Sequence, residues 1–273
     1  MFITRHKLKD KFVYRGTKSN DDIARIKKLK IPPIWVDVKI DVNPNAKIQA
    51  TGYDIKGRKQ YIYNEKWLEK SKKKKFKKIK DFNYDHYSNV INIYIKKKDL
   101  SRECVIANII KIMEDLNIRV GNESYKKENG SYGITTLLKK HINNNTLNFV
   151  GKKGIEHTKR IKNINSINFI KRVCKIKGEN LFYDSDGKGI SSSDLNTFLR
   201  NNVNSNITCK DIRTYRANQI FLNYMKKITP GKTDKDKKKQ IIEGIDHTAK
   251  ELGNTRKICK DSYLSPENIN KFT

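Results

Sequence analysis

The spacing of apolar residues changes along this chain, and that change limits what the chain can fold into. In the first third, β-branched and aromatic residues alternate with polar ones, which is the pattern of half-buried strands. The segments that show it are 34–40, 47–51 and 60–63. A turn over 54–58 joins the last two, so we expect a small antiparallel meander. A short helix over about 21–30, ended by Pro32 and Pro33, should precede it.

Beyond about residue 100, apolar residues recur at the three- and four-residue spacing of helices. The clearest such face begins after the candidate N-cap residues Asp99 and Ser101 and runs to about residue 116. Further helices are expected over 194–199, 212–228 and 240–252, the first of them capped by Ser192 or Ser193. A small β unit interrupts the helical part, with strands over 146–150 and 155–161.

A run of lysines over 70–80 (KSKKKKFKKIK) separates the two patterns. The run fits a solvated helix face or an import signal, and it also fits a domain junction that lies along a phosphate backbone. The basic character of the whole chain favours the junction. We therefore expect an α+β fold, with a small N-terminal antiparallel β domain over 1–72 and a mainly α domain over 73–273.

The charge of the chain indicates its partner. Lys and Arg number 60 against 29 Asp and Glu, so the formal net charge is +31. A compact body with this charge repels itself, and a nucleic-acid backbone is the polyanion that gains most from it through counterion release. A membrane is not expected as a partner, because no apolar run is long enough to span a bilayer and neither end carries a strongly amphipathic basic helix.

Two short motifs resemble cofactor-binding loops, but each lacks a residue that the loop requires. Residues 230–233 (PGKT) end like a phosphate-binding loop, but Lys226 stands where the first glycine is required. Residues 184–187 (DSDG) begin like a calcium loop, but Lys188 occupies a ligand position and no glutamate closes the site, so a polar turn is expected. We expect neither a metal nor another cofactor.

The cysteines and the N-terminus indicate a compartment. The four cysteines are too far apart in sequence to form a metal knuckle, and they favour a reducing, intracellular compartment. The first residues contain no apolar signal core, so secretion is not expected. The abundance of Lys, Asn and Ile suits an AT-rich genome such as a viral one, which makes a virion or viral factory a candidate location.

Four motifs, taken in order, resemble the type IB DNA topoisomerases, especially the small poxvirus-like and bacterial ones. They are NIRVG (117–121), FVGKK (149–153), KDIRTY (210–215), and GNT (253–255) followed by SY (262–263). Residues 56–63 (KGRKQYIY) look like the DNA-clamping β domain of that family. The resemblance covers most of the chain. It implies a monomer that closes on duplex DNA as a C-clamp and relaxes supercoils without ATP or metal.

The resemblance also implies a role for each of five residues. Tyr263 would be the nucleophile, forming a 3′-phosphotyrosyl link and releasing a 5′-hydroxyl. Arg119 and Arg213 would hold the non-bridging oxygens, and Lys152 would protonate the leaving 5′-oxygen. Asn254, where many members have histidine, would donate a hydrogen bond to a non-bridging oxygen. Reversible strand cleavage needs these parts: a covalent nucleophile, fixed cations around the phosphorane, and an acid.

Further residues are expected to contact DNA. By their positions in the family motifs they are Gln60, Tyr61, Tyr63, Tyr125 and Lys210. Any single one of the 13 tyrosines or 60 basic residues is more often a packing residue or a solvated charge. Only the joint pattern singles these residues out.

Two other functions remain open at this point. A tyrosine recombinase or integrase shares the nucleophile and the arginine pair, but it usually carries His-x-x-Arg where this chain has Lys210 and Arg213, and its DNA-binding arm is typically helical. A non-catalytic DNA-packaging protein would explain the charge but not the ordered motifs. His141 and His157 are expected at hairpin surfaces rather than as ligands.

Overall fold

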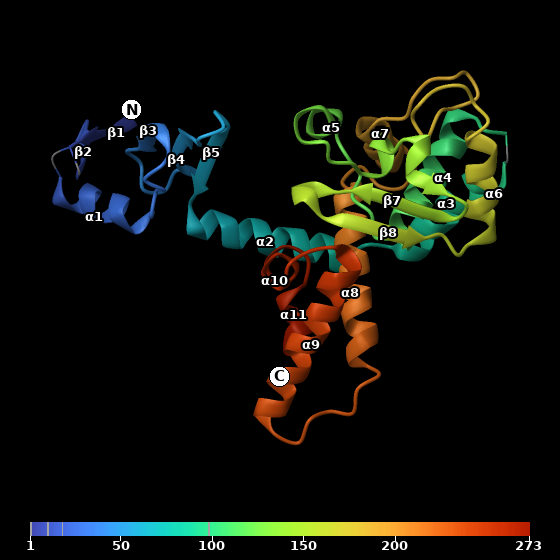
Figure 1. The fold of residues 1–273 in the computed structure, drawn as a ribbon. Helices are drawn as coiled ribbons and strands as arrows, with labels where there is room; N and C mark the ends of the chain where they lie inside the picture. Colours follow the sequence, from blue (N-terminus) through green and yellow to red (C-terminus); the bar gives the residue numbers. More distant parts are fainter. Residues whose placement is uncertain (1, 10, 18, 98) are drawn as a thin grey trace. The chain divides into compact units, whose positions relative to one another are not determined.

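The computed structural model describes residues 2–9, 11–17, 19–97 and 99–273 (Figure 1). The chain divides into two compact units, one that ends at Lys80 and one that begins at Asp81. The first contains an antiparallel sheet and the second is mainly helical, which confirms the predicted α+β class. Residue 72 lies within helix α2 (Glu65–Lys80), and the domain boundary placed there stays a prediction.

The first unit is built on one sheet with the strand order β2-β1-β3-β4-β5. Its strands are β1 (Phe2–Leu8), β2 (Lys11–Arg15), β3 (Val36–Asp41), β4 (Ile48–Tyr53) and β5 (Lys59–Tyr63). The last three form the predicted meander, which is confirmed. Strands β1 and β2 were not predicted, because basic residues over 4–15 hide the alternation.

The two faces of this sheet differ in chemistry. Strand pairing aligns one buried row: Ile3, Ile40, Ala50 and Ile62. Helix α1 (Asn20–Lys28), which confirms the helix predicted near 21–30, packs Ile26 into the same core. Because neighbouring residues of a strand point to opposite faces, the next row lies on the other side. That row is hydroxyl-bearing and basic: Thr4, Lys39, Thr51 and Tyr61.

The second unit is packed around α4 (Arg102–Asp115), which confirms the helix that the apolar spacing predicted; ten of its 14 residues are buried, more than a single apolar face provides. The helices that contact it are α3 (Tyr84–Lys96), α6 (Ile164–Val173), α7 (Ser192–Asn202) and α8 (Cys209–Met225). A small antiparallel sheet completes this part, with strands β6 (Ile142–Asn143), β7 (Thr146–Val150) and β8 (Glu156–Arg160). The predicted strands at 146–150 and 155–161 are confirmed.

A separate apolar cluster joins α8 to the C-terminal helices. These are α9 (Asp234–Leu252), α10 (Arg256–Ser262) and α11 (Pro266–Asn270). Phe221 and Met225 of α8 pack there with Ile245, Leu252 and Tyr263. The cluster therefore fixes the C-terminal segment against the helix that carries Arg213.

Side-chain caps explain why two helices begin earlier than the sequence predicted. The Asp211 carboxylate accepts the Thr208 backbone N–H at 3.0 Å, so α8 starts before residue 212. A capping box also begins α9, where the Thr233 hydroxyl accepts the Asp236 N–H at 3.1 Å. The PGKT motif at 230–233 thus ends in a helix cap.

The calcium-like motif is the predicted polar turn. The Asp184 carboxylate accepts the Lys188 backbone N–H at 2.8 Å and also binds the Arg102 guanidinium at 2.6 Å. Its oxygens are therefore used within the fold. Helix α7, which follows, is capped by Ser191 rather than by either of the two serines after it.

Candidate active site

Helix α4 ends in a turn that positions the Asn117 carbonyl and Arg119. The N–H of Ile118 bonds to the Met113 carbonyl at 3.0 Å, and the preceding N–H closes the inner bond of a Schellman motif. Asn117 takes the left-handed position with φ of 53°, a conformation that Asn tolerates better than most residues. The turn presents the Asn117 carbonyl and then leads the chain into Arg119.

Helix α9 ends in the same kind of turn. The N–H of Asn254 bonds to the Ala249 carbonyl at 2.8 Å, and Gly253 holds the left-handed position with φ of 58° and ψ of 50°. Asn254 follows directly, so the turn fixes its amide. Two helix ends of the same geometry therefore place the motifs at 117–121 and 253–255.

Arg119 is fixed through both its backbone and its side chain. Its carbonyl accepts the Ile134 N–H at 2.8 Å, which ties it to the short helix η1 (Ile134–Thr136). Its Nη2 donates to the Gly253 carbonyl at 3.4 Å and to the side-chain oxygen of Asn254. The predicted residues Arg119 and Asn254 are thus in direct contact.

Arg213 is nearly buried, with 6% of its surface exposed. Its two terminal nitrogens donate to the backbone carbonyls of Asn117 and Leu252, so both helix ends hold it. Burial lowers the pKa of Arg213 to about 10, and the neighbouring Tyr263 opposes that change. The guanidinium therefore remains a fixed cation at neutral pH.

Tyr263 lies directly after α10, beside Arg213. Its ring centroid is 5.5 Å from the Arg213 guanidinium carbon, and only 9% of the residue is exposed. Together with Arg119 and Asn254, four of the five residues predicted to act on the phosphate lie around the end of α9. They come from four separate stretches of the chain.

Asn218 of α8 holds the Tyr263 segment in place. Its Nδ2 donates to the Tyr263 carbonyl at 2.8 Å, and its Oδ1 accepts the Ser265 N–H at 2.9 Å. The sequence analysis missed this residue. An amide among the buried positions of a helix was the available signal, because such a group needs partners within the fold.

The side-chain nitrogen of Asn254 donates to no group of the described residues. The side-chain oxygen of Asn254 accepts from Arg119, whereas Nδ2 is buried and has no hydrogen-bond partner within the described residues. An amide nitrogen in that state can donate to an oxygen that enters the site.

Lys152 lies apart from these four residues. It is exposed at the start of η3 (Lys152–Gly154), between β7 and β8, and none of its described contacts reaches them. Its Nζ lies 5.6 Å from the ring centroid of Tyr125, a half-exposed residue of α5 (Glu123–Asn129) and a predicted DNA contact. Lys210 is exposed in the first turn of α8, three residues before Arg213.

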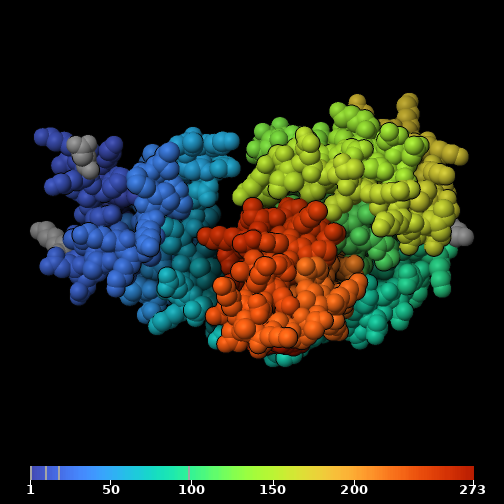
Figure 2. Space-filling model, turned by 60° about the horizontal axis from the view of Figure 1, so that its bottom comes forward, coloured from blue at the N-terminus to red at the C-terminus, as the bar shows by residue number. Residues whose placement is uncertain are grey.

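The sequence predicted His157 at the surface, and this prediction is wrong. The residue is half-buried beside the site. Its ring stacks on Phe149 with centroids 5.0 Å apart. A Cβ added at Gly151 would lie 2.7 Å from the ring, and one added at Gly253 would lie 2.4 Å from it. Burial lowers the ring's pKa to about 4, and the nearby lysine and arginines add to the effect. A neutral ring therefore separates the two glycines. Figure 2 shows the C-terminal segment (red) against the β7–β8 hairpin (yellow-green).

The other predicted surface histidine, His141, is also half-buried, and its Nδ1 accepts the Leu138 N–H at 3.0 Å.

Within the described residues, the His, Cys, Asp and Glu side chains form no group of three that could hold a metal ion. In the same part of the chain, no helix is long and apolar enough to cross a membrane.

The predicted DNA contacts of the first unit lie on β5. Tyr61 and Tyr63 are on the same side with ring centroids 6.1 Å apart, and Tyr63 stacks on Trp67 at 5.2 Å. Tyr61 is 44% exposed. The side chain of Gln60 donates instead to the Asp54 carboxylate at 2.9 Å. The tyrosines thus form an aromatic row in which Tyr61 is exposed and Tyr63 is partly buried, whereas Gln60 is held by the preceding turn.

Comparison with known proteins gives matches to DNA topoisomerases, both among family models and among individual proteins. The model of the family "Eukaryotic DNA topoisomerase I, catalytic core" matches residues 60–272, and that of "Bacterial DNA topoisomerase IB, N-terminal domain" matches residues 12–54. DNA topoisomerase 1B of Acanthamoeba polyphaga mimivirus is 36% identical over 285 residues, covering 96% of this chain and 84% of that protein. DNA topoisomerase I of Monkeypox virus is 28% identical, over 78% of this chain and 69% of that protein.

Proposed function

Since the chain belongs to the type IB DNA topoisomerase family, we propose that it relaxes supercoiled DNA by cutting and resealing one strand through a 3′-phosphotyrosyl link on Tyr263. The family matches make the chain a DNA topoisomerase, and the steps and their residues are our proposal. The observation that supports this proposal is that four residues lie together at the end of α9: Arg119, Arg213, Asn254 and Tyr263.

In the proposed cleavage step, the Tyr263 hydroxyl oxygen attacks the phosphorus and gives up its proton to water. The bond from phosphorus to the 5′-oxygen breaks, and Lys152 protonates that oxygen. Negative charge grows on the non-bridging oxygens, where Arg119 and Arg213 stabilise it. The free Nδ2 of Asn254 adds one hydrogen bond. Religation reverses each transfer.

Relaxation follows from the covalent intermediate. While Tyr263 holds one DNA end, the other end rotates about the intact strand and releases torsion. The phosphotyrosyl bond stores the energy needed for resealing, so the proposed cycle uses neither ATP nor a metal. A relaxation assay on plasmid DNA in EDTA without nucleotide tests this, and strand exchange between two duplexes would favour the recombinase function instead.

The nucleophile is tested by replacing Tyr263 with Phe, which removes only the attacking oxygen. We expect Tyr263→Phe to bind duplex DNA like the wild type and to form no covalent adduct on denaturing gels. Tyr224→Phe, which changes another tyrosine of the same apolar cluster, should form the adduct at the normal rate. Mapping the adduct peptide to a residue other than Tyr263 would contradict the assignment.

We further propose that the chain acts as a monomer whose two units close on duplex DNA as a C-clamp. The row of Lys39, Thr51 and Tyr61, in which Lys39 and Tyr61 are exposed and Thr51 is partly buried, supports a DNA-facing sheet, since it offers an amine, hydroxyls and an aromatic ring to a polyanion. The cysteines are all unpaired, which supports a reducing, intracellular location, and the viral relatives support action in a viral factory or virion.

A further inference from the structure

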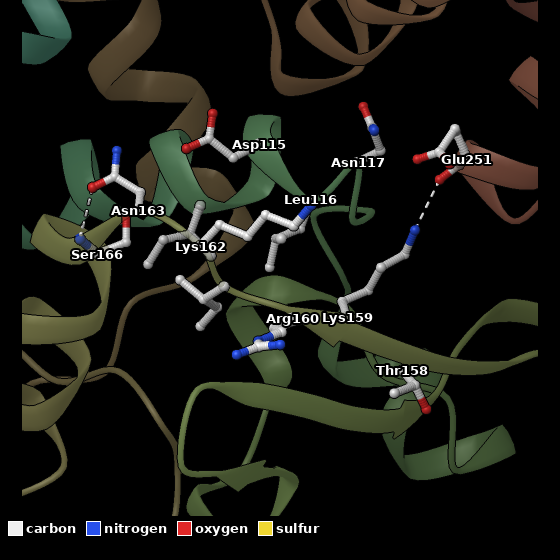
Figure 3. Close-up of a pocket in the computed structure, with 12 residues that line it drawn as sticks. Asp115, Leu116, Asn117, Thr158, Lys159, Arg160, Lys162, Asn163, Ser166 and Glu251 are labelled. Atoms are coloured by element: carbon white, nitrogen blue, oxygen red, sulfur yellow. Dashed lines mark hydrogen bonds between the residues drawn. The ribbon is translucent and has the colours of Figure 1, made fainter.

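Strand β8 contacts the end of α9 through Lys159. The Lys159 Nζ donates to the Glu251 carbonyl at 3.0 Å (Figure 3). Lys159 is half-buried, whereas its strand neighbours Thr158 and Arg160 are exposed. The lysine thus lies on the inner side of the strand and forms a fixed link between the β7–β8 hairpin and α9.

The link is part of a regular arrangement. The consecutive carbonyls of residues 251–253 each accept from a different cation: the first from Lys159, the next from Arg213 and the last from Arg119. The final carbonyls of a helix lack partners within it, and cations are favoured at that end. The end of α9 therefore organises Lys159 by the same chemistry that it uses for both arginines.

The contact beside Lys159 is tight. His157 precedes it by two residues on the same side of β8, and its ring fills the space between Gly151 and Gly253. Those glycines directly precede Lys152 and Asn254. A shift of β8 relative to α9 would therefore move Lys152 relative to the rest of the site.

We infer that Lys159 is a positioning residue that fixes the hairpin carrying Lys152 against the end of α9. The inference rests on the proposed function, in which Lys152 meets the same phosphate as the arginines. Within the described residues, the hydrogen bond of Lys159 goes to the Glu251 carbonyl and not to a residue placed on the phosphate, so Lys159 acts through Lys152. A misplacement of about 1 Å in a catalytic group can slow a reaction by about a hundredfold.

A double-mutant cycle tests whether Lys159 acts through Lys152. We expect Lys159→Met to slow single-turnover cleavage by about tenfold or more in the wild-type background. In the Lys152→Ala background the same change should cost less than about twofold, because the group that it positions is already absent. Equal losses in both backgrounds, or no loss in the wild type, would overturn the inference.

Two variants serve as controls. Arg160→Met removes an exposed charge from the same strand and should leave the cleavage rate unchanged, whereas Lys159→Arg keeps a donor and should retain most activity. Lys159 lines a cavity of about 440 Å³, so the Met side chain has room. If the Met variant does not fold, Lys159→Gln is measured in its place with the same expected results.

Amide hydrogen exchange supplies a readout that does not depend on cleavage. The Gly151 N–H bonds to the Ile155 carbonyl at 2.7 Å and reports on the hairpin. Lys159→Met should speed exchange there by about tenfold without changing exchange in α4. Unchanged hairpin exchange would overturn the positioning role, whereas absence of any Tyr263 adduct in the wild type would overturn the proposed function alone.

Discussion

At the scale of single residues, our proposal gives the Asn254 amide two hydrogen-bonding tasks. Its oxygen accepts from Arg119, and its Nδ2, which has no partner within the described residues, would donate to the substrate. A neutral histidine can also accept with one nitrogen and donate with the other. We therefore expect Asn254→His to keep substantial cleavage activity. Asn254→Ala should lose about two orders of magnitude, the usual effect of removing one transition-state donor.

Asn254→Asp separates the two tasks. Aspartate keeps an acceptor for Arg119 but offers no donor, and it brings negative charge to an anionic phosphate. Its single-turnover cleavage rate should fall at least as far as that of the Ala variant. If the Asp variant cleaves like the wild type, contact with Arg119 is the whole role of Asn254.

Lys152 and Lys153 are adjacent, but the structure gives them different backbones. Lys153 has φ of 66°, a conformation that glycine adopts more readily, so Lys153→Gly should cost little stability or activity. Lys152→Ala should be nearly inactive on ordinary DNA. A 5′-bridging sulfur leaves without a proton, so Lys152→Ala should recover most of its cleavage rate on that substrate. Rescue of a Lys153 variant instead would move the acid by one residue.

The sequence could identify the motif residues but not the residues that support them. Recognisable sequence motifs contain Arg119, Arg213, Asn254 and Tyr263. Asn218 has its role only because α8 passes beneath the Tyr263 segment, 45 positions later in the chain. His157 and Lys159 alternate on a strand like ordinary surface residues, and only their packing against α9 reveals them.

At the scale of elements, periodicity predicted the interiors of helices and strands better than their ends. The meander β3–β5 and helix α4 followed from apolar spacing. The starts of α8 and α9 did not, because the capping boxes at Thr208 and Thr233 extend each helix into polar sequence. Strand β1 pairs with β3, a long-range contact with no local signal, and β2 pairs only with β1 within the described residues.

The packing of the β7–β8 hairpin on α9 depends on glycine at position 151. An added Cβ would meet the His157 ring at 2.7 Å, so Gly151→Ala should lower the free energy of unfolding by about 1–3 kcal/mol. Adding His157→Ala should recover much of that loss, since the obstructing ring is gone. Urea denaturation of both variants measures this. Gly189→Ala, where the nearest atom lies at 4.0 Å, should be nearly neutral.

At the scale of the whole molecule, the net charge of +31 indicated a polyanionic partner but not the surface that meets it. Helix α2 is the most concentrated part of that charge. Its exposed Lys70, Lys73, Lys74 and Lys77 recur at helical spacing and form one stripe, whereas Phe76 and Ile79 are buried. Four lysines of the run therefore lie together on one exposed side of the helix, which suits contact with a phosphate backbone.

The stripe should control how DNA binding depends on salt. If the chain neutralises several phosphates, affinity for duplex DNA should fall about a thousandfold or more between 50 and 200 mM salt. Replacing the four stripe lysines with Gln keeps good helix formers. The slope of log affinity against log salt should then become less negative by roughly 0.9 for each stripe lysine that contacts a phosphate.

The matched control removes the same number of charges from another helix. Lys232, Lys235, Lys238 and Lys239 are exposed around the start of α9, so their replacement by Gln changes the net charge by the same amount. If α2 lies along the DNA, this variant should keep the wild-type slope, because long-range attraction is screened beyond about 10 Å at 0.1 M salt. Equal changes in both variants would mean that salt dependence follows net charge alone, and that the lysine run is an ordinary solvated helix face.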